Sequence, residues 1–188
     1  MDKPQLWILV GGNGAGKSTF YKTRLQPLGL PFINADLIAR ELFPVASETH
    51  SYEAAQVARQ MVNAQLAAGN SFCFETVFSH PSKIDLLGKA KALGYEIIMV
   101  VLYLGLQNLN VARVSQRVIE GGHSVPVAKI KSRIPRTFEN IKIAAPLCDG
   151  IYLIDNSSAE NPFQVIAQRH NEQEILIEPL PQWARLIL

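Results

Sequence analysis

The sequence is poor in several features that would point to a specialised class of protein. Only two cysteines occur in 188 residues, and Cys73 and Cys148 each lie in or beside an apolar stretch. We therefore expect buried, reduced thiols, with neither a disulfide framework nor a zinc ligand set. Charged residues make up 18%, and 18 basic against 16 acidic side chains leave a formal charge of only +2. This balance argues against a nucleic-acid or membrane-surface protein, although local basic clusters could still bind phosphate.

Long hydrophobic runs are also missing. No apolar run approaches the length of a membrane span, and the run in MDKPQLWILVGG is too short for a cleavable signal. Hydrophobic residues nevertheless make up 48% of the chain, which is long enough to bury a core. We expect a compact cytoplasmic enzyme with one domain over residues 1–188, and we expect no membrane partner.

Short apolar runs alternate with longer segments of helical periodicity, a pattern typical of a parallel α/β sheet covered on both faces. The expected strands are Leu6–Val10, Pro31–Asn34, Ser71–Glu75, Tyr95–Leu104 and Gly150–Asp155. The expected helices are Lys17–Gln26, Asp36–Leu42, Tyr52–Ala68, Ser82–Leu93, Leu106–Glu120, Pro126–Ala144 and Asn161–Arg169. Pro135 should break or kink the sixth of these helices. The last stretch, EILIEPLPQWARLIL, is expected to add an edge strand and a packed tail.

A glycine-rich segment follows the first expected strand. GGNGAGKST fits the pattern G-x-x-x-x-G-K-[ST] in the strand-to-helix context that this pattern requires. Its backbone N–H groups can converge on phosphate, and the amino terminus of the next helix adds a favourable dipole. Lys17 is expected to reach the β- and γ-phosphates, and the Ser18 hydroxyl is expected to ligate Mg²⁺. The residues assigned to nucleotide binding here are Gly11, Gly12, Asn13, Gly14, Ala15, Gly16, Lys17, Ser18 and Thr19.

Acidic residues after two other strands indicate what happens to the nucleotide. The base-reading motif of guanine-nucleotide switches is absent, and YEIIMVVLYL ends without the acidic residue of a motor ATPase. Asp36 follows FINA and Glu75 ends SFCFE, so both should lie beside the loop at the carboxyl edge of the sheet. Asp36 is our candidate base for an acceptor hydroxyl, unless it only caps the helix that follows. Glu75, with Thr76 beside it, would bind that acceptor or the outer shell of Mg²⁺.

Arginines surround the segment GGHSVP. Arg113 and Arg117 share one helix face, and Arg133 and Arg136 follow the glycine pair. Two arginine-bearing helices joined by a Gly-Gly hinge could form a lid that closes over the phosphates, although each arginine alone could be a solvated surface residue. His123, in the hinge, is a candidate substrate contact or a structural residue.

Asn156 lies in YLIDNSS, after the fifth expected strand. A polar residue there could hold the adenine ring, or it could form an ordinary turn.

Taken together, these stretches resemble the zeta-toxin family of P-loop kinases, in particular its short single-domain members. The resemblance covers about Leu6 to Ser158 and rests on GGNGAGKST, FINADLIAR, FETVFS, RVIEGGHSVPVAKIKSRIPRTFENI and YLIDNSS. It implies a single-domain, three-layer P-loop kinase-like fold, with a mainly parallel five-stranded sheet and a helical lid.

The resemblance also implies chemistry: transfer of phosphate from ATP with Mg²⁺ to a sugar hydroxyl of UDP-N-acetylglucosamine. It assigns Asp36 as the base, Glu75 as an acceptor-side carboxylate, and Lys17 with Arg117 and Arg133 as the phosphoryl clamp. Arg136 and Arg113 are the next choices for the clamp. Zeta toxins are longer than this chain and are blocked by an antitoxin, a partner that nothing in the sequence reveals.

We therefore expect a kinase that phosphorylates a hydroxyl of a small molecule. Two alternatives stay open. One is a regulatory nucleotide-binding protein that acts through a partner. The other is a nucleic-acid-end kinase, which the charge balance and an aromatic content of 8% disfavour, so nucleic acid is not an expected partner.

Overall fold

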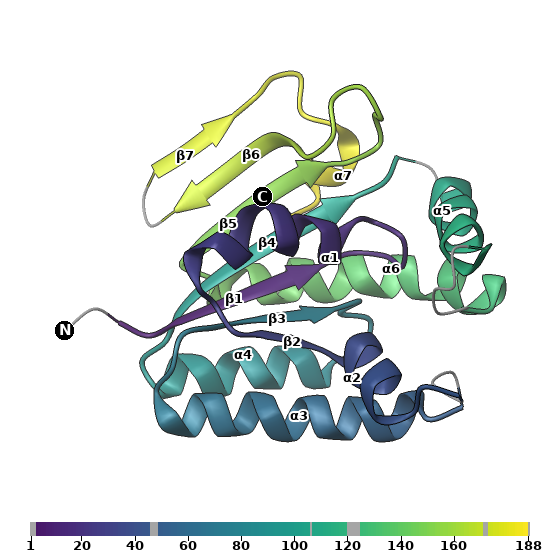
Figure 1. Ribbon diagram of the computed structural model, residues 1–188. Helices are drawn as coiled ribbons and strands as arrows, with labels where there is room; N and C mark the ends of the chain where they lie inside the picture. Colours follow the sequence, from purple (N-terminus) through teal and green to yellow (C-terminus); the bar gives the residue numbers. More distant parts are fainter. Residues whose placement is uncertain (1–2, 46–48, 106, 120–124, 171–172, 188) are drawn as a thin grey trace.

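In a computed structural model, which describes residues 3–45, 49–105, 107–119, 125–170 and 173–187, the chain forms a seven-stranded sheet between layers of helices (Figure 1). The strand order across the sheet is β2-β3-β1-β4-β5-β6-β7. The strands are β1 (Gln5–Val10), β2 (Phe32–Asn34), β3 (Phe72–Thr76), β4 (Glu96–Tyr103), β5 (Gly150–Asp155), β6 (Gln164–His170) and β7 (Gln173–Leu176).

The five strands expected from the sequence are confirmed, but the expected size of the sheet was wrong. β1 to β5 pair in parallel, as predicted, whereas β6 pairs with β5 and β7 with β6 in antiparallel. The sheet is therefore mixed and has seven strands rather than five. The expected edge strand in the last stretch is present as β7.

The helix expected over Asn161–Arg169 was also wrong, because this segment contains β6. Val165 and Ile166 are β-branched residues, which favour a strand, and the open edge of β5 offers a full ladder of hydrogen bonds. A short apolar run of this kind fits either state locally, and the pairing with β5 decides between them.

The other expected helices are present, with small differences at their ends. They are α2 (Ala35–Leu42), α3 (Ser51–Ala68), α4 (Ser82–Ala92), α5 (Gln107–Ile119) and α6 (Val127–Ala144). The first is split into α1 (Lys17–Phe20), a π-helical turn (Tyr21–Leu25) and a 3₁₀ turn (Gln26–Leu28), and α7 (Gln182–Arg185) forms the tail. The break expected at Pro135 does not occur, because α6 runs through it.

Two apolar layers cover the two faces of the sheet. Leu6, Ile8 and Val10 of β1 contribute to the larger core, which α3, α4, α6 and α7 cover. Leu9, which points to the other face, packs with Phe20 and neighbouring residues of the α1 segment. Within the described residues, no helix is long and apolar enough to cross a membrane.

The carboxyl ends of β1, β2 and β3 lie side by side. Val10 is in register with Thr76, and Glu75 is in register with Asn34. The three segments that follow these strands therefore begin at one edge of the sheet, as the sequence predicts for a parallel sheet.

Candidate active site

The glycine-rich part of the phosphate loop, residues 11–16, joins β1 to α1, and three of its glycines, Gly11, Gly14 and Gly16, have a positive φ. Gly11 and Gly16 have φ angles of 145° and 94°, which L side chains rarely adopt. A Cβ on Gly11 would collide with the carbonyl oxygen of Leu102, and a Cβ on Gly16 would lie 2.5 Å from Nδ2 of Asn156. Close packing against β4 and the loop after β5 therefore fixes the path of the loop.

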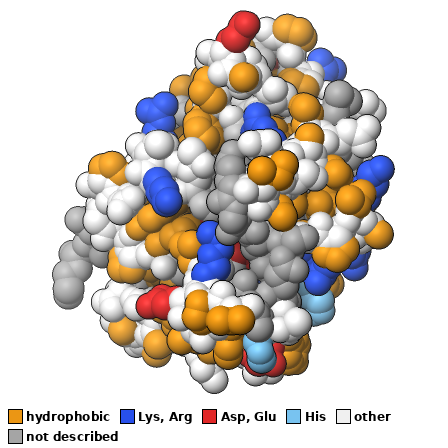
Figure 2. Space-filling view, turned by 45° about the vertical axis from the view of Figure 1, so that its right-hand side comes forward, with side chains coloured by type: hydrophobic (Ala, Val, Ile, Leu, Met, Phe, Trp, Pro, Cys, Tyr) orange, Lys and Arg blue, Asp and Glu red, His pale blue; other side chains and the backbone are white. Residues whose placement is uncertain are grey.

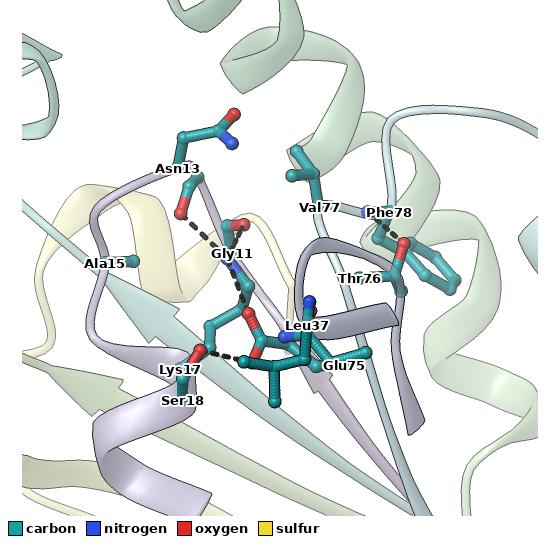
Figure 3. Close-up of polar contacts among 12 residues, drawn as sticks. Gly11, Asn13, Ala15, Lys17, Ser18, Leu37, Glu75, Thr76, Val77 and Phe78 are labelled. Atoms are coloured by element: carbon teal, nitrogen blue, oxygen red, sulfur yellow. Dashed lines mark hydrogen bonds and ion pairs between the residues drawn. The ribbon is translucent and has the colours of Figure 1, made fainter. Parts of the chain in front are cut away.

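Lys17 and Ser18 contact Glu75 where the loop meets the end of β3 (Figure 3). The Lys17 Nζ donates hydrogen bonds of 3.0 Å to the carbonyl oxygens of Gly11 and Gly12 and lies 3.8 Å from Glu75 Oε1. The Ser18 hydroxyl donates a 2.7 Å hydrogen bond to Glu75 Oε2. The side chains of Lys17 and Glu75 are only 6% and 9% exposed. Glu75 is thus a buried carboxylate held directly against the expected Mg²⁺ ligand.

Asp36 is the second residue of α2, and its half-buried side chain lines the cleft beside the loop. It does not cap this helix. Asn34 is the N-cap, because its side-chain oxygen accepts a 3.0 Å hydrogen bond from the Leu37 backbone N–H. The capping interpretation of Asp36 was therefore wrong, and its carboxylate faces the cleft instead.

Two of the four predicted lid arginines line this cleft. Arg133, on α6, is half-buried; burial lowers its pKa, the Asp36 charge opposes that shift, and the Arg136 charge adds to it. Both side chains line the cleft, and the Arg133 guanidinium stays charged because arginine titrates far above neutral pH. Arg113, on α5, donates a 2.9 Å hydrogen bond to the Asn156 carbonyl oxygen.

The other predicted residues are placed differently. Arg136 is exposed, is not among the residues that line the cleft, and hydrogen-bonds Ser132 one turn earlier on α6. Arg117 belongs to α5, but its side chain lies outside the described residues, as do His123 and the two hinge glycines. Thr76 lines the cleft and accepts a 3.2 Å hydrogen bond from the Phe78 backbone N–H.

Two asparagines tie the phosphate loop to distant parts of the chain. Asn156 is 4% exposed, donates a 2.9 Å hydrogen bond to the Ala15 carbonyl oxygen, and accepts one from the Phe163 backbone N–H. Asn110, on α5, donates a 2.8 Å hydrogen bond to the Asn13 carbonyl oxygen and is 3% exposed. Sequence reasoning placed Asn156 near the nucleotide but missed Asn110, because no local pattern marks a residue that bonds a loop 97 positions away.

The loop, Asp36, Glu75 and Arg133 share one open cleft of about 1380 Å³. Among the described residues, basic side chains dominate its charged lining, and the two acidic ones are Asp36 and Glu75. The basic residues are Lys17, Lys22, Arg40, Arg59, Lys83, Arg113, Lys129 and Arg133. Lys and Arg side chains also outnumber acidic ones on the face shown in Figure 2. A chain with little net charge thus places eight of its 18 Lys and Arg residues at one cleft, which favours ligands with several negative charges.

A metal ion at this site would need few protein ligands. The described residues contain no group of three or more His, Cys, Asp or Glu side chains suited to holding a metal. Mg²⁺ is commonly held by one or two protein oxygens together with phosphates and waters. The Ser18 hydroxyl beside the Glu75 carboxylate fits that requirement.

Comparison with known proteins agrees with this architecture. An uncharacterised protein of Haemophilus influenzae (strain Rd) is 25% identical over 140 residues, which cover 71% of this chain and 99% of that protein. The AvrRxo1-ORF1:ORF2 complex contains a chain that matches 98% of this one with a TM-score of 0.75 and 16% identity. This chain spans 64% of that one.

A chain of the PezAT chromosomal toxin–antitoxin system of Streptococcus pneumoniae matches all of this chain with a TM-score of 0.67 and 12% identity, and 78% of that chain is covered. The TM-scores show that these proteins share a P-loop kinase-like fold, and at identities this low they show the fold alone. The family itself follows from the sequence, because residues 6–137, well over half of the chain, match the model of an AAA domain. The protein therefore belongs to this AAA domain family.

Proposed function

We propose that the protein is an ATP-dependent phosphotransferase that transfers the γ-phosphate to a hydroxyl group of a small molecule. One observation carries the proposal: Asp36, a carboxylate that does not cap its helix, lines the same cleft as the phosphate loop and Arg133. A structure of the AvrRxo1-ORF1:ORF2 complex with ATP, at a TM-score of 0.65, supports ATP as the donor.

Different residues of the cleft act on the acceptor and on the phosphoryl group during in-line transfer. Asp36 accepts the proton of the acceptor hydroxyl as its oxygen bonds to the γ-phosphorus. The bond from that phosphorus to the oxygen shared with the β-phosphate breaks, and ADP leaves. Lys17 and Arg133 supply positive charge to the phosphoryl group as it moves.

Ser18 and Glu75 would hold Mg²⁺ beside the triphosphate. When bound, this ion neutralises charge on the β- and γ-phosphate oxygens. Glu75 orients the Ser18 hydroxyl through their 2.7 Å hydrogen bond. The buried Asn13 Oδ1 has no hydrogen-bond partner within the described residues, which fits a loop built to receive a ligand.

For the identity of the acceptor, we propose a sugar nucleotide such as UDP-N-acetylglucosamine. We also propose an antitoxin-like protein as a partner. The resemblance to zeta toxins supports both ideas. The two solved neighbours also come from a two-component complex and a toxin–antitoxin system.

The test is an acceptor screen with γ-labelled ATP and Mg²⁺, with each product identified by mass. Asp36→Asn should lower the rate of transfer by about 100- to 10,000-fold, the usual contribution of a positioned base. ATP affinity should stay within about twofold, since Asp36 faces the acceptor. The matched control is Glu41→Gln, an exposed change on the same helix outside the cleft, which should leave both values unchanged.

The same screen decides between this function and its alternatives. Equal ATP turnover in wild type and Asp36→Asn, whatever acceptor is offered, would support a regulatory nucleotide-binding protein. The abundance of cations in the cleft gives the nucleic-acid-end kinase one specific argument. That alternative predicts phosphorylation of a 5′-hydroxyl oligonucleotide, with binding that weakens steeply as salt rises.

A further inference from the structure

A second pair of cations lies on the cleft wall formed by helices α3 and α4. Arg59 belongs to α3 and Lys83 to the first turn of α4. These helices cover the face of the sheet opposite α1, which begins with Lys17 of the phosphate loop (Figure 1). Lys17 and Arg133, the cations assigned above to the moving phosphoryl group, do not include this pair.

Within the described part of the chain, the side chains of Arg59 and Lys83 take part in no ion pair or hydrogen bond. The ammonium of Lys83 lies 5.0 Å above the ring of Phe74, a residue of β3. Burial lowers the pKa of Lys83, and the neighbouring Arg59 charge lowers it further.

Arg59 and Lys83 lie where a ligand could reach both of them. Arg59 and Lys83 line the main cleft and also a side pocket of about 180 Å³ that opens between α3 and α4. Asp85 is the acidic residue of this side pocket, and it is exposed. Two like charges held side by side repel each other, and an anion placed between them would remove that cost.

We propose that Arg59 and Lys83 form the subsite that binds the phosphate group of the acceptor, and that they select phosphorylated acceptors over neutral ones. This inference rests on the phosphotransfer function proposed above. Near pH 7 a terminal phosphate carries close to two negative charges, and the diphosphate of a sugar nucleotide carries two in total. Either group matches a pair of cations, one of them a guanidinium, better than a single carboxylate does. The cleft is also larger than the roughly 300–1,000 Å³ of a typical single-ligand pocket, so it has room for a donor and an acceptor.

The experiment measures binding separately from chemistry. The wild-type protein is saturated with Mg²⁺ and a non-hydrolysable ATP analogue, which fills the phosphate loop, and inorganic phosphate is titrated by calorimetry. The double variant Arg59→Gln/Lys83→Gln should bind phosphate about tenfold more weakly or worse, with unchanged affinity for the analogue. The matched control, Arg24→Gln/Lys142→Gln, removes the same charge from exposed positions outside the cleft and should bind as wild type does.

Several results would overturn the proposal: no phosphate binding to the saturated wild type, equal binding by the double variant, or equal weakening in the control. A thermal melt of each variant checks that it is folded. If Lys83→Gln alone unfolds the protein, Arg59→Gln is used by itself, because Arg59 is exposed and its loss leaves no cavity.

A kinetic comparison then connects the site to the acceptor. N-acetylglucosamine is compared with N-acetylglucosamine 1-phosphate and UDP-N-acetylglucosamine, and the double variant should raise KM only for the phosphorylated compounds. If phosphate binds as expected but ATP phosphorylates none of the acceptors, the proposed function fails while the anion site stands. Two results would refute a small phosphorylated acceptor. One is that N-acetylglucosamine is phosphorylated with the same kcat/KM as N-acetylglucosamine 1-phosphate, and the other is that an oligonucleotide competes for binding through Arg59 and Lys83.

Discussion

Glu75 connects the end of β3 to two side chains that follow the glycines of the phosphate loop. Its carboxylate accepts a hydrogen bond from Ser18 and lies within ion-pair distance of Lys17, and it is almost completely buried. A buried carboxylate is retained only where partners compensate its lost hydration. Ser18 and Lys17 are those partners, and they are also the two loop side chains expected to face the metal and the phosphates.

Replacing Glu75 by Gln keeps its size but removes its charge. We expect Glu75→Gln to raise the Mg²⁺ concentration needed for half-maximal ATP binding by about 10- to 100-fold, the usual effect of losing an outer-shell partner. ATP affinity measured in EDTA should change far less, because the loop N–H groups remain. Fluorescence titration of a labelled ATP analogue at several Mg²⁺ concentrations measures both. If Glu75→Gln lowers ATP affinity equally with and without Mg²⁺, this role of Glu75 is contradicted.

At the scale of elements, helix α6 is fastened to the turn that follows β3. The Thr137 hydroxyl donates a 2.8 Å hydrogen bond to the Val77 carbonyl oxygen, and Asn140 Nδ2 donates one of 2.9 Å to Phe78. Phe78 is fully buried with φ of 64°, a conformation that is unfavourable for a bulky residue. Because Arg133 lies one turn before Thr137, this attachment sets where its guanidinium enters the cleft.

Thr137→Val removes the hydroxyl without changing the shape of the side chain. It should lower the free energy of unfolding by about 1–3 kcal/mol, because the partly buried Val77 carbonyl loses its partner. It should also lower the rate of phosphoryl transfer more than ATP affinity, since Arg133 acts on the moving phosphate. Urea denaturation and the acceptor assay measure the two effects.

Thr23→Val provides the control for this change, because the Thr23 hydroxyl is exposed and bonds only its own helical segment. Its stability and transfer rate should be close to those of wild type. A Thr137→Val protein that loses stability but keeps its full transfer rate would show that the attachment does not position Arg133.

At the scale of the whole molecule, a chain of hydrogen bonds joins strands at the amino edge of the sheet, opposite the cleft. Glu96, the first residue of β4, accepts a 2.7 Å hydrogen bond from Gln5 of β1 and lies 2.9 Å from Nε2 of His170 on β6. The hydrogen bond with His170 and that with Gln5 hold the pKa of Glu96 below its ordinary value of 4.5. The antiparallel extension of the sheet is thereby linked to its parallel centre.

The lowered pKa of Glu96 makes a prediction about stability in acid. A carboxyl with a depressed pKa stabilises the folded state above its unfolded value, and this contribution is lost as the pH falls below about 4.5. Glu96→Gln should therefore cost about 1 kcal/mol at pH 7, and this difference from wild type should shrink between about pH 5 and about pH 3. Urea denaturation at each pH measures the difference. Glu139→Gln, an exposed change on α6, should show no such trend, and a difference for Glu96→Gln that stays constant would contradict the linkage.

How far the sequence predicts this protein depends on the range of the interactions involved. The path from β1 through the phosphate loop into α1 is encoded locally, by an apolar run followed by glycines, so it could be predicted. The segment of β6 could not, because its strand depends on pairing with β5. Asn34 and Asp36 are both suited to capping a helix, and only the start of α2 at Ala35 decides between them.

Residue order by itself determined the match to the AAA domain family, the glycine-rich loop after the first strand, the five parallel strands and the two acidic residues at the ends of β2 and β3. Only the tertiary structure decided that Glu75 lies against Ser18, that Asn110 and Asn156 hold the loop, and that eight cations converge on one cleft. The physical reason is distance along the chain: hydrogen bonds and charges act through space, and positions 57 to 141 residues apart become neighbours only when the sheet assembles.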